Sequence, residues 1–273
     1  MVTHDAILDV PRELVLEVSR LLAAERRERG TRRGARALTC FKQALLVLRH
    51  FREAAIAEAL ARDNTISRAT AYRYIGEGTD VLARNAPELA EVLEQALSRG
   101  RTVILDGKLF ESDRCRLPKP DDSGTDLWYS GHKCHHGGNV QLLADDRGKP
   151  LWSSPAEPGS VSDITAARLH VLPLLRKAAK QGLTTFADLG YEGAGTGVHV
   201  PVKRPKDVAP DRFSADNRAA NLLLRGLRAV GERAFALLVG RWRLLRRTTK
   251  SPSRIGDLVK AALVLYKLEK QTH

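Results

Sequence analysis

Two short apolar runs in the sequence lead directly into an aspartate. Thr102–Leu105 precedes Asp106, and Thr184–Ala187 precedes Asp188. Short runs rich in β-branched and apolar residues predict buried strands. An acid at the end of such a strand is exposed beside the sheet, where α/β folds place their binding sites. Asp106 and Asp188 are therefore candidate ligands for a cation at one sheet edge.

A third carboxylate stands in a basic helix that the sequence predicts over Leu222–Leu245. Glu232 is the only acid between Arg225 and Arg254, a segment with nine Lys and Arg side chains. One interpretation is an intrahelical ion pair with Arg228. The other is a ligand that reaches a cation while its basic neighbours hold phosphates. Three such carboxylates suit Mg²⁺ or Mn²⁺, because these ions prefer oxygen ligands. Two ions of this kind clamp the attacking and leaving oxygens of an in-line phosphoryl transfer, which requires no nucleophilic side chain.

The positive charge is concentrated in the last quarter of the sequence. The chain has 273 residues and a formal net charge of +13, and residues 201–273 carry 17 basic and 6 acidic side chains. Residues 1–100 carry 16 and 14, and residues 101–200 carry 12 and 12. A basic excess confined to one region predicts a surface for a polyanion, with nucleic acid as the natural partner. The alternative is a solvated charge run.

Other features restrict the class of protein. No apolar run approaches the roughly 20 residues of a membrane span, and the first residues lack the basic start of a secretory signal. Three scattered cysteines, Cys40, Cys115 and Cys134, do not predict a disulfide framework. The sequence therefore predicts a cytoplasmic protein with no membrane partner. The heavy use of Arg over Lys is typical of a GC-rich bacterial genome.

A helix-turn-helix is predicted within residues 39–78. Ala54–Arg62 and Arg68–Glu77 have helical patterns, Asp63–Ile66 suits a tight turn, and Ser67 suits an N-cap. In this motif the N-terminal residues of the second helix contact base edges in the major groove. The alternative is a plain helical bundle with an exposed polar helix. The candidate contacts are Ser67, Arg68, Thr70, Ala71, Arg73 and Tyr74.

Several motifs, taken together and in this order, resemble those of DDE transposases, most closely bacterial insertion-sequence enzymes related to the Harbinger-type elements. The resemblance covers about residues 38 to 268. The motifs are Leu105–Gly107, Tyr129–Lys133, Asn139–Gln141, Pro158–Asp163, Ala187–Tyr191 and Gly231–Ala234.

The resemblance implies a fold, an activity and a set of site residues. It implies a ribonuclease H-like catalytic domain, which is an α/β fold with a mixed sheet flanked by helices, after a small all-α helix-turn-helix domain. We expect the helical domain over residues 1–99 and the catalytic domain over residues 100–273. The implied metal ligands and catalytic residues are Asp106, Asp188 and Glu232, in agreement with the pattern of acids described above.

Asp163 competes with Asp188 for the role of second carboxylate. It matches an acid of the family's Gly-Ser-x-x-Asp motif, but it also stands where a helix N-cap is expected, and capping explains an Asp without catalysis. We therefore expect Asp163 to support the site from nearby. Further candidates for contacts with DNA phosphates are His132, Lys133, Lys203, Arg204, Arg228, Arg241, Arg243, Arg246 and Arg247.

The Cys and His residues between Cys115 and His136 have the types of zinc ligands, but their spacing matches no closed zinc site. Trp128, Trp152 and Trp242 are candidates for stacking on unpaired bases, although Trp152 and Trp242 are better explained as core residues.

The predicted function is metal-dependent cleavage of DNA at transposon ends, followed by strand transfer into target DNA. The predicted partners are the terminal inverted repeats, the target DNA and a second copy of the chain, which would make a homodimer on paired ends. A nucleoid-associated location in the cytoplasm follows from these partners. Two other functions stay open: a catalytically silent DNA-binding protein derived from a transposase, and a metal-dependent endonuclease that does not transpose.

Overall fold

The computed structural model describes residues 7–271, without 121–123, 206, 208 and 210–213. Its contacts divide the chain into two compact units. The first unit is the chain up to Ala86 together with Val239–Arg246 and the segment from Asp257 onward. The second unit is Pro87–Leu238 together with Arg247–Gly256.

The first unit is helical. Its α2 begins where the side chain of Thr39 accepts a hydrogen bond from the N–H of Lys42 at 3.2 Å, as expected of an N-cap threonine. Its core is apolar and fully buried, and includes Leu14, Leu22, Leu46, Phe51, Leu60 and Ile75. The helices are α1 (Arg12–Glu28), α2 (Cys40–Glu53), α3 (Ala57–Asp63), α4 (Arg68–Arg84), η3 (Arg243–Arg246) and most of α9 (Ile255–Gln271).

Buried polar contacts hold α4 against α2. Glu77 is 7% exposed and accepts hydrogen bonds from Arg36 at 3.0 Å and from Nε2 of Gln43 at 3.2 Å. Oε1 of Gln43 accepts in turn from Arg26 at 2.6 Å. Because a buried acid without partners is costly, these contacts favour one rotation of α4. That rotation decides which residues of α4 reach solvent.

The predicted pair of helices joined by a tight turn is present in this unit. In α4 the side chain of Ser67 accepts a hydrogen bond from the N–H of Thr70 at 3.1 Å, as an N-cap does. The helix runs to Arg84, one to two turns beyond the predicted end at Glu77, because its last turns are apolar and pack in the core through Val81 and Leu82.

The second unit is built on a mixed sheet with the strand order β2-β3-β1-β5-β6, in which β4 also pairs with β3. Strand β1 is antiparallel to β3 and parallel to β5, and β5 is parallel to β6. The strands are β1 (Val103–Glu111), β2 (Tyr129–Ser130), β3 (His135–Asp145), β4 (Pro150–Pro158), β5 (Thr185–Phe186) and β6 (Val198–His199).

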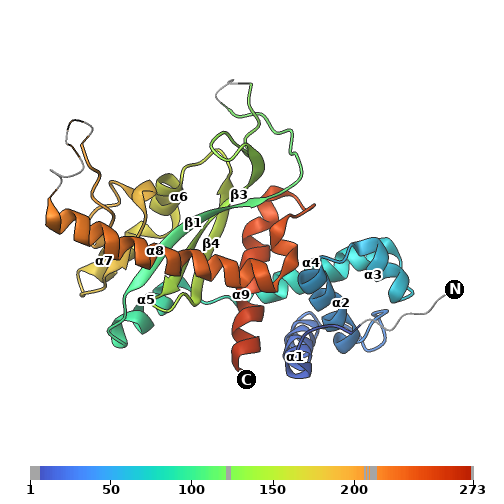
Figure 1. Ribbon diagram of the computed structural model, residues 1–273. Coiled ribbons are helices and arrows are strands. Elements are labelled where there is room, and N and C mark those ends of the chain that lie inside the picture. Colours follow the sequence, from blue (N-terminus) through green and yellow to red (C-terminus); the bar gives the residue numbers. More distant parts are fainter. Residues whose placement is uncertain (1–6, 121–123, 206, 208, 210–213, 272–273) are drawn as a thin grey trace. The chain divides into compact units, whose positions relative to one another are not determined.

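Helices cover both faces of this sheet (Figure 1). Side chains alternate along a strand, so Val103 and Leu105 share one face, and both pack in a core with α5 (Leu89–Ser98) and α7 (Leu172–Ala179). The intervening residues point to the opposite face, where α8 (Ala215–Arg241) lies; Phe110 contacts Phe235 there with ring centroids 5.9 Å apart. The short helix α6 (Asp163–His170) contacts β3 and β4. The predicted α/β class with a mixed sheet flanked by helices is confirmed.

Two expectations differ from the structure. The domain boundaries differ: helix α5 belongs to the second unit, because Leu89, Val92 and Leu93 pack in that unit's core, so the contacts divide the chain near residue 86 and not near residue 99. In addition, Val239–Arg246 and the segment from Asp257 onward, expected in the catalytic domain, belong to the first unit. Strand β1 does not end at Asp106 but continues to Glu111. The reason is its partner β3, which stays paired with β1 as far as Gly137.

None of the helices in the described part of the chain combines the length and apolar character that a membrane span requires.

Candidate active site

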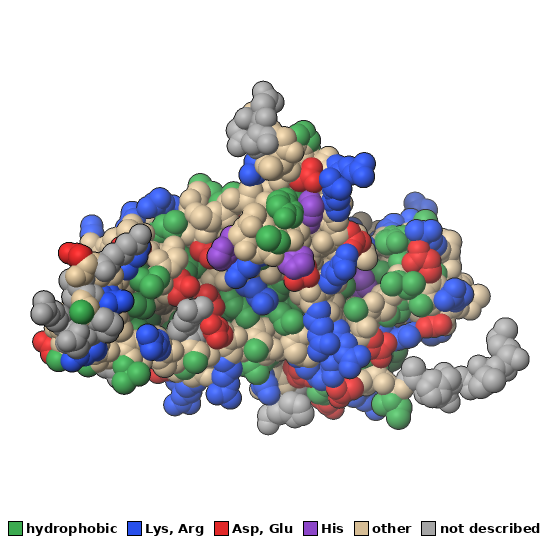
Figure 2. All heavy atoms as spheres, turned by 45° about the horizontal axis from the view of Figure 1, so that its top comes forward, with side chains coloured by type: hydrophobic (Ala, Val, Ile, Leu, Met, Phe, Trp, Pro, Cys, Tyr) green, Lys and Arg blue, Asp and Glu red, His purple; other side chains and the backbone are tan. Residues whose placement is uncertain are grey.

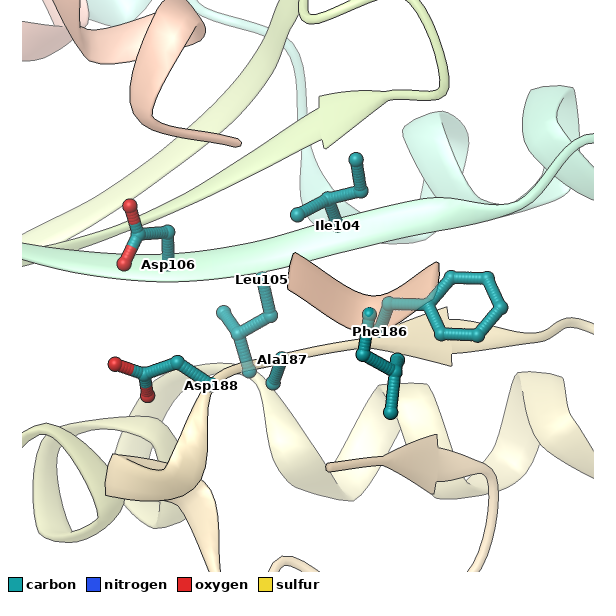
Figure 3. A pocket seen from close by; sticks show the side chains of 7 residues that line it. Ile104, Leu105, Asp106, Phe186, Ala187 and Asp188 are labelled. Carbon is teal, nitrogen blue, oxygen red and sulfur yellow. The ribbon is translucent and has the colours of Figure 1, made fainter. Parts of the chain in front are cut away.

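Asp106 and Asp188 come together because their strands are parallel neighbours. Strand β5 pairs with β1 only through Thr185 and Phe186, so the pairing of the two strands ends at Ile104, two residues before Asp106. Asp106 therefore lies on β1 just past the segment paired with β5, and Asp188 lies two residues after the end of β5. Both side chains line one pocket and lie at the same end of it, and the remaining lining residues are apolar (Figure 3).

Both carboxylates are oriented by the backbone. Oδ1 of Asp106 accepts a hydrogen bond from the N–H of Gly107 at 2.9 Å. Oδ1 of Asp188 accepts from the N–H of Gly190 at 2.8 Å, at the start of the short helix η1 (Leu189–Tyr191). Such bonds restrict the rotamers of the two acids, so their orientation does not depend on a ligand.

Negative charge is in excess around Asp106. Burial first, and then the nearby charges of Asp188, Asp163 and Glu232, together raise the pKa of the Asp106 carboxyl to about 7, against the lowering effect of the Gly107 N–H. A carboxyl whose charged form is disfavoured by both burial and like charges is typical of functional sites. The charges of Asp188, Asp163 and Glu232 therefore all act on the carboxyl group of Asp106.

Glu232 approaches this position because Gly231 lets α8 lie close to β1. A Cβ atom on Gly231 would stand 2.9 Å from Cγ2 of Ile104 and 3.7 Å from Cβ of Asp106. The glycine is therefore required by a close approach of helix and strand. Glu232, the next residue, is exposed at its side chain.

Gly231→Ala should lower the stability of the protein by about 1 kcal/mol, because the added methyl group overpacks the contact with β1. The matched control is Gly226→Ala on the same helix, where a Cβ atom would meet nothing within 4 Å. This control should raise stability by up to about 1 kcal/mol through helix propensity. Urea unfolding measures both variants, and a gain in stability for Gly231→Ala would contradict the close approach.

Asp163 is not the N-cap of its helix. Helix α6 has Ser162 at the N-cap position, and Asp163 is its first residue. The carboxylate instead accepts a hydrogen bond from Nδ2 of Asn139 at 2.8 Å, and its Oδ1 would lie 2.4 Å from a Cβ atom on Gly107. Asp163 therefore occupies the space over Gly107, and capping does not explain its presence.

The donor chemistry of the four acids fits Mg²⁺ or Mn²⁺, since all are hard oxygen ligands and a divalent cation offsets the negative charge that raises the pKa of Asp106. The four carboxylates are neighbours but do not point to one common position for an ion. Within the ranges that the structure describes, no three His, Cys, Asp or Glu side chains form a group that could hold a metal ion. The same holds for the Cys and His residues between Cys115 and His136, and His136, on β3, pairs with Asp126 at 3.0 Å.

Four residues of this site were not given a role from the sequence: Gly107, Asn139, Gln141 and Tyr191. A glycine in the middle of a strand indicates close approach of another group, which was the available signal for Gly107. Polar residues on a strand that is otherwise apolar, as in Asn139-Val140-Gln141, indicate a buried hydrogen-bonded network. For Tyr191 the sequence offers no comparable signal.

Some of the predicted DNA-contacting residues on α4 are exposed to solvent, and others are buried. Ser67, Arg68 and Arg73 are exposed, and Thr70 is half-buried. Arg68 forms an ion pair with Glu58 at 2.6 Å and lies 5.5 Å from the ring centre of Tyr72. Tyr72 is 40% exposed on the same helix face and was missed among the candidates.

Tyr74 and Ala71 are wrong as DNA contacts. Tyr74 is 1% exposed and Ala71 is fully buried, and the hydroxyl of Tyr74 accepts a hydrogen bond from the N–H of Leu38 at 3.2 Å. The buried contacts of Glu77 turn this side of α4 toward the core. Both residues therefore hold the helix in place.

Arg241 is also better explained by packing. Its guanidinium binds both oxygens of Glu269 and also Asp9, the latter pair at 2.8 Å. These carboxylates occupy the donors that a phosphate would need, so Arg241 joins parts of the first unit.

The other predicted phosphate contacts are on the surface. Lys203 and Arg204 follow Val202, whose backbone N–H and C=O both bond to the side chain of Asn221 on α8. Arg247 pairs with Asp113 at 3.0 Å. The side chain of Arg228 lies outside the described residues. On the face drawn in Figure 2, Lys and Arg side chains are numerous and stand among Asp and Glu. The exposed candidates are His132, Lys133, Lys203, Arg204, Arg243, Arg246 and Arg247.

The predicted core positions of two tryptophans are confirmed. Trp242 is fully buried and Trp152 is 7% exposed. Trp128 is 9% exposed. At these exposures the rings are not available as stacking surfaces for bases.

The mixed sheet, with carboxylates on its central strand, at the end of the adjacent strand and on a covering helix, defines an α/β protein with an acidic site. Residues 105–267 match the family described as DDE superfamily endonuclease. The chain belongs to this family, and the matched segment contains Asp106, Asp163, Asp188 and Glu232. The resemblance to DDE transposases is thereby confirmed at the level of the family; the bacterial origin and the relation to Harbinger-type elements stay predictions.

Comparison with other proteins adds little to the family match. No curated protein matches the chain. The Mos1 transposase paired-end complex with the left transposon end is 12% identical, covering 99% of this chain and 82% of that chain with a TM-score of 0.20. The Mos1 strand transfer complex is 12% identical, covering 98% and 80% with a TM-score of 0.21. Scores this low carry no structural argument.

Proposed function

We propose that this chain is a transposase that cleaves DNA at transposon ends in a metal-dependent reaction and joins the ends to target DNA. The observation that carries the proposal is the raised pKa of Asp106, about 7, caused by burial and by three neighbouring acids within a DDE endonuclease family segment. Such an accumulation of negative charge is destabilising without a cation. Its retention is explained by a site that binds divalent ions.

In this proposal Asp106, Asp188 and Glu232 would hold two Mg²⁺ or Mn²⁺ ions. When bound there, the ions would supply the positive charge that activates an attacking oxygen and stabilises a leaving oxygen of a phosphodiester. The chain itself supplies orientation: the N–H groups of Gly107 and Gly190 hold the two aspartates in place. The pocket beside the two aspartates is otherwise lined by apolar side chains, including Leu105, Phe186 and Leu224.

The proposed partner is DNA, and the first unit binds it through α4. The exposed Ser67, Arg68, Tyr72 and Arg73 lie in its first two turns, which is the part of a recognition helix that reaches base edges. The exposed basic residues Lys133, Lys203, Arg204, Arg243, Arg246 and Arg247 contact phosphates. Two copies act together on paired ends, and the protein works at the nucleoid in the cytoplasm.

One assay tests the reaction. The purified protein is incubated with a labelled duplex that carries the terminal repeat of the flanking element, and with a supercoiled plasmid, in Mg²⁺ or in EDTA. Cleaved and joined products in Mg²⁺ alone support the transposase. Cleavage without joining identifies a non-transposing endonuclease, and specific binding without products identifies a silent DNA-binding protein.

Arg73→Ala should weaken binding to the terminal repeat by about 10-fold or more and should relax sequence preference, because base contacts contribute about 1–3 kcal/mol each. Arg68→Ala should have a smaller effect, since Glu58 already competes for its guanidinium. The matched control is Arg20→Ala on α1, another exposed arginine paired with a glutamate. Binding to the repeat and to a scrambled duplex is measured for each variant. Equal losses on both duplexes would assign Arg73 to the phosphate backbone.

A further inference from the structure

A chain of buried polar side chains runs behind the acidic site. The hydroxyl of Tyr191 donates to Oε1 of Gln141 at 2.6 Å. Nε2 of Gln141 donates to Oδ1 of Asn139 at 3.1 Å, and Nδ2 of Asn139 donates to Oδ1 of Asp163 at 2.8 Å. Gln141 is fully buried, and Tyr191 and Asn139 are 1% and 6% exposed. Water therefore does not compete for these bonds.

The direction of the bonds follows from the two ends of the chain. Nδ2 of Asn139 faces two acceptors, the carboxylate of Asp163 and the carbonyl of Val161, the latter at 3.0 Å. The amide group of Asn139 must therefore point its NH₂ group this way, which leaves its oxygen for Gln141. Gln141 then presents its own oxygen to Tyr191. Every donor is directed toward Asp163, so the bonds reinforce one another.

The chain also connects Asp163 with Asp188. Tyr191 belongs to the helical turn that Asp188 begins, and the N–H of Tyr191 donates to the carbonyl of Asp188 at 3.1 Å. Burial raises the pKa of Tyr191 well above its usual value, and the charges of Asp163, Asp106 and Asp188 raise it further. The hydroxyl thus stays a donor, and its ring lies within electrostatic reach of three of the four acids.

Gly107 completes the arrangement on the other side. A Cβ atom at this position would lie 2.4 Å from Oδ1 of Asp163 and 2.9 Å from Nε2 of Gln141. A side chain at position 107 would therefore displace both groups. The absence of a side chain lets Asp163 reach β1 at the residue after Asp106, on the face of the sheet opposite to α8.

We propose that Tyr191, Gln141 and Asn139 are positioning residues, which hold Asp163 as a fourth carboxylate over Gly107, the residue after Asp106, and set its place relative to Asp188. This inference rests on the proposed metal-dependent function. It assigns Asn139 and Gln141, whose side chains touch no reacting group, an effect on cation binding that acts through Asp163. We call the hydrogen-bonded chain from Tyr191 through Gln141 and Asn139 to Asp163 the relay. Hydrogen-bonded partners behind metal ligands orient those ligands, and their loss commonly weakens metal affinity by 10- to 100-fold.

A double-mutant cycle tests the relay with Mn²⁺ alone. The unfolding temperature of the full chain is measured against Mn²⁺ concentration, since a bound ion stabilises the folded state by an amount that grows with the logarithm of the ion concentration divided by Kd. Asp163→Asn should weaken Mn²⁺ binding by about 10-fold, and Tyr191→Phe by about 3- to 10-fold. The double variant should bind no more weakly than Asp163→Asn, because the tyrosine acts through the aspartate.

Controls separate positioning from general damage. Tyr266→Phe removes a hydroxyl from another buried tyrosine, on α9, and should leave Mn²⁺ binding unchanged. Gln141→Met breaks the same relay at its centre and replaces Tyr191→Phe if that variant does not fold in EDTA. Multiplying effects in the double variant, or unchanged Mn²⁺ binding in Asp163→Asn, would overturn the relay.

The same titration distinguishes this inference from the proposed function. If Asp106→Asn and Asp188→Asn weaken Mn²⁺ binding but Asp163→Asn does not, the metal site stands and the relay fails. If Asp106→Asn and Asp188→Asn leave Mn²⁺ binding unchanged, the proposed metal site itself is wrong, and the relay falls with it.

Discussion

Asp188→Asn should lower the rate of DNA cleavage by about 10³-fold or more, because a neutral amide replaces a charged oxygen ligand at the proposed metal site. The substitution keeps an oxygen that accepts the hydrogen bond from Gly190, so the turn of η1 should persist. The loss is therefore expected in the chemistry and not in the fold. DNA binding through α4 should be unchanged.

Cleavage of the labelled terminal repeat in Mg²⁺ measures this effect. The matched control is Glu192→Gln, which neutralises an exposed acid four residues along the chain and should cleave like the original protein. Asp163→Asn should reduce the rate without abolishing cleavage. Retention of more than about a tenth of the activity by Asp188→Asn would remove this residue from the ligand set, and abolition by Asp163→Asn alone would exchange the two roles.

Asp106→Asn should stabilise the metal-free protein by roughly 2–4 kcal/mol above pH 7. The pKa of Asp106 is about 7 in the folded protein, against an ordinary value of 3.8 for an aspartate carboxyl, so the folded state binds this proton more tightly than the unfolded state does. Stability from this group is therefore highest at low pH, falls as the pH rises from about 4 to 7, and stays low above that. Asparagine carries no such proton and avoids the loss.

Urea unfolding in EDTA at pH 5 and pH 8 measures this difference. The gain from Asp106→Asn should be larger at pH 8 than at pH 5, and Mg²⁺ should reduce it by stabilising the original protein. Glu111→Gln, at the exposed end of the same strand, is the matched control and should show no such pH dependence. A variant that is less stable than the original protein at pH 8 would show that Asp106 is not destabilised by its neighbours.

Local pattern was enough to predict the elements that carry the site. The apolar runs before Asp106 and Asp188 are strands β1 and β5, and the basic segment around Glu232 is α8. Alternation and helical spacing are properties of neighbouring residues, so a sequence displays them directly. The extent of β1 was not predictable in this way, because it depends on pairing with β3, which is distant in sequence.

Exposure on α4 was less predictable. Helical spacing placed Tyr74 among the DNA contacts, but the buried contacts of Glu77 with Arg36 and Gln43 turn this side of α4 inward and leave Tyr72 exposed. Likewise, the sequence placed Arg241 among the basic residues that could contact phosphates, but in the structure it pairs with the carboxylates of Asp9 and Glu269. Partners from distant segments decide whether a charge faces solvent or another side chain.

The sequence by itself determined which residue types are present for the chemistry: acids after apolar strands, an isolated acid in a basic helix, and a capped helix suited to DNA. The tertiary structure decided how those residues act. It placed Asp163 over Gly107 and not at a helix cap, and it joined Asp163 to Tyr191 through Gln141 and Asn139. The physical reason is that spacing fixes only which face of its own element a side chain occupies, whereas charge repulsion, burial and hydrogen bonding depend on what the fold brings opposite to it.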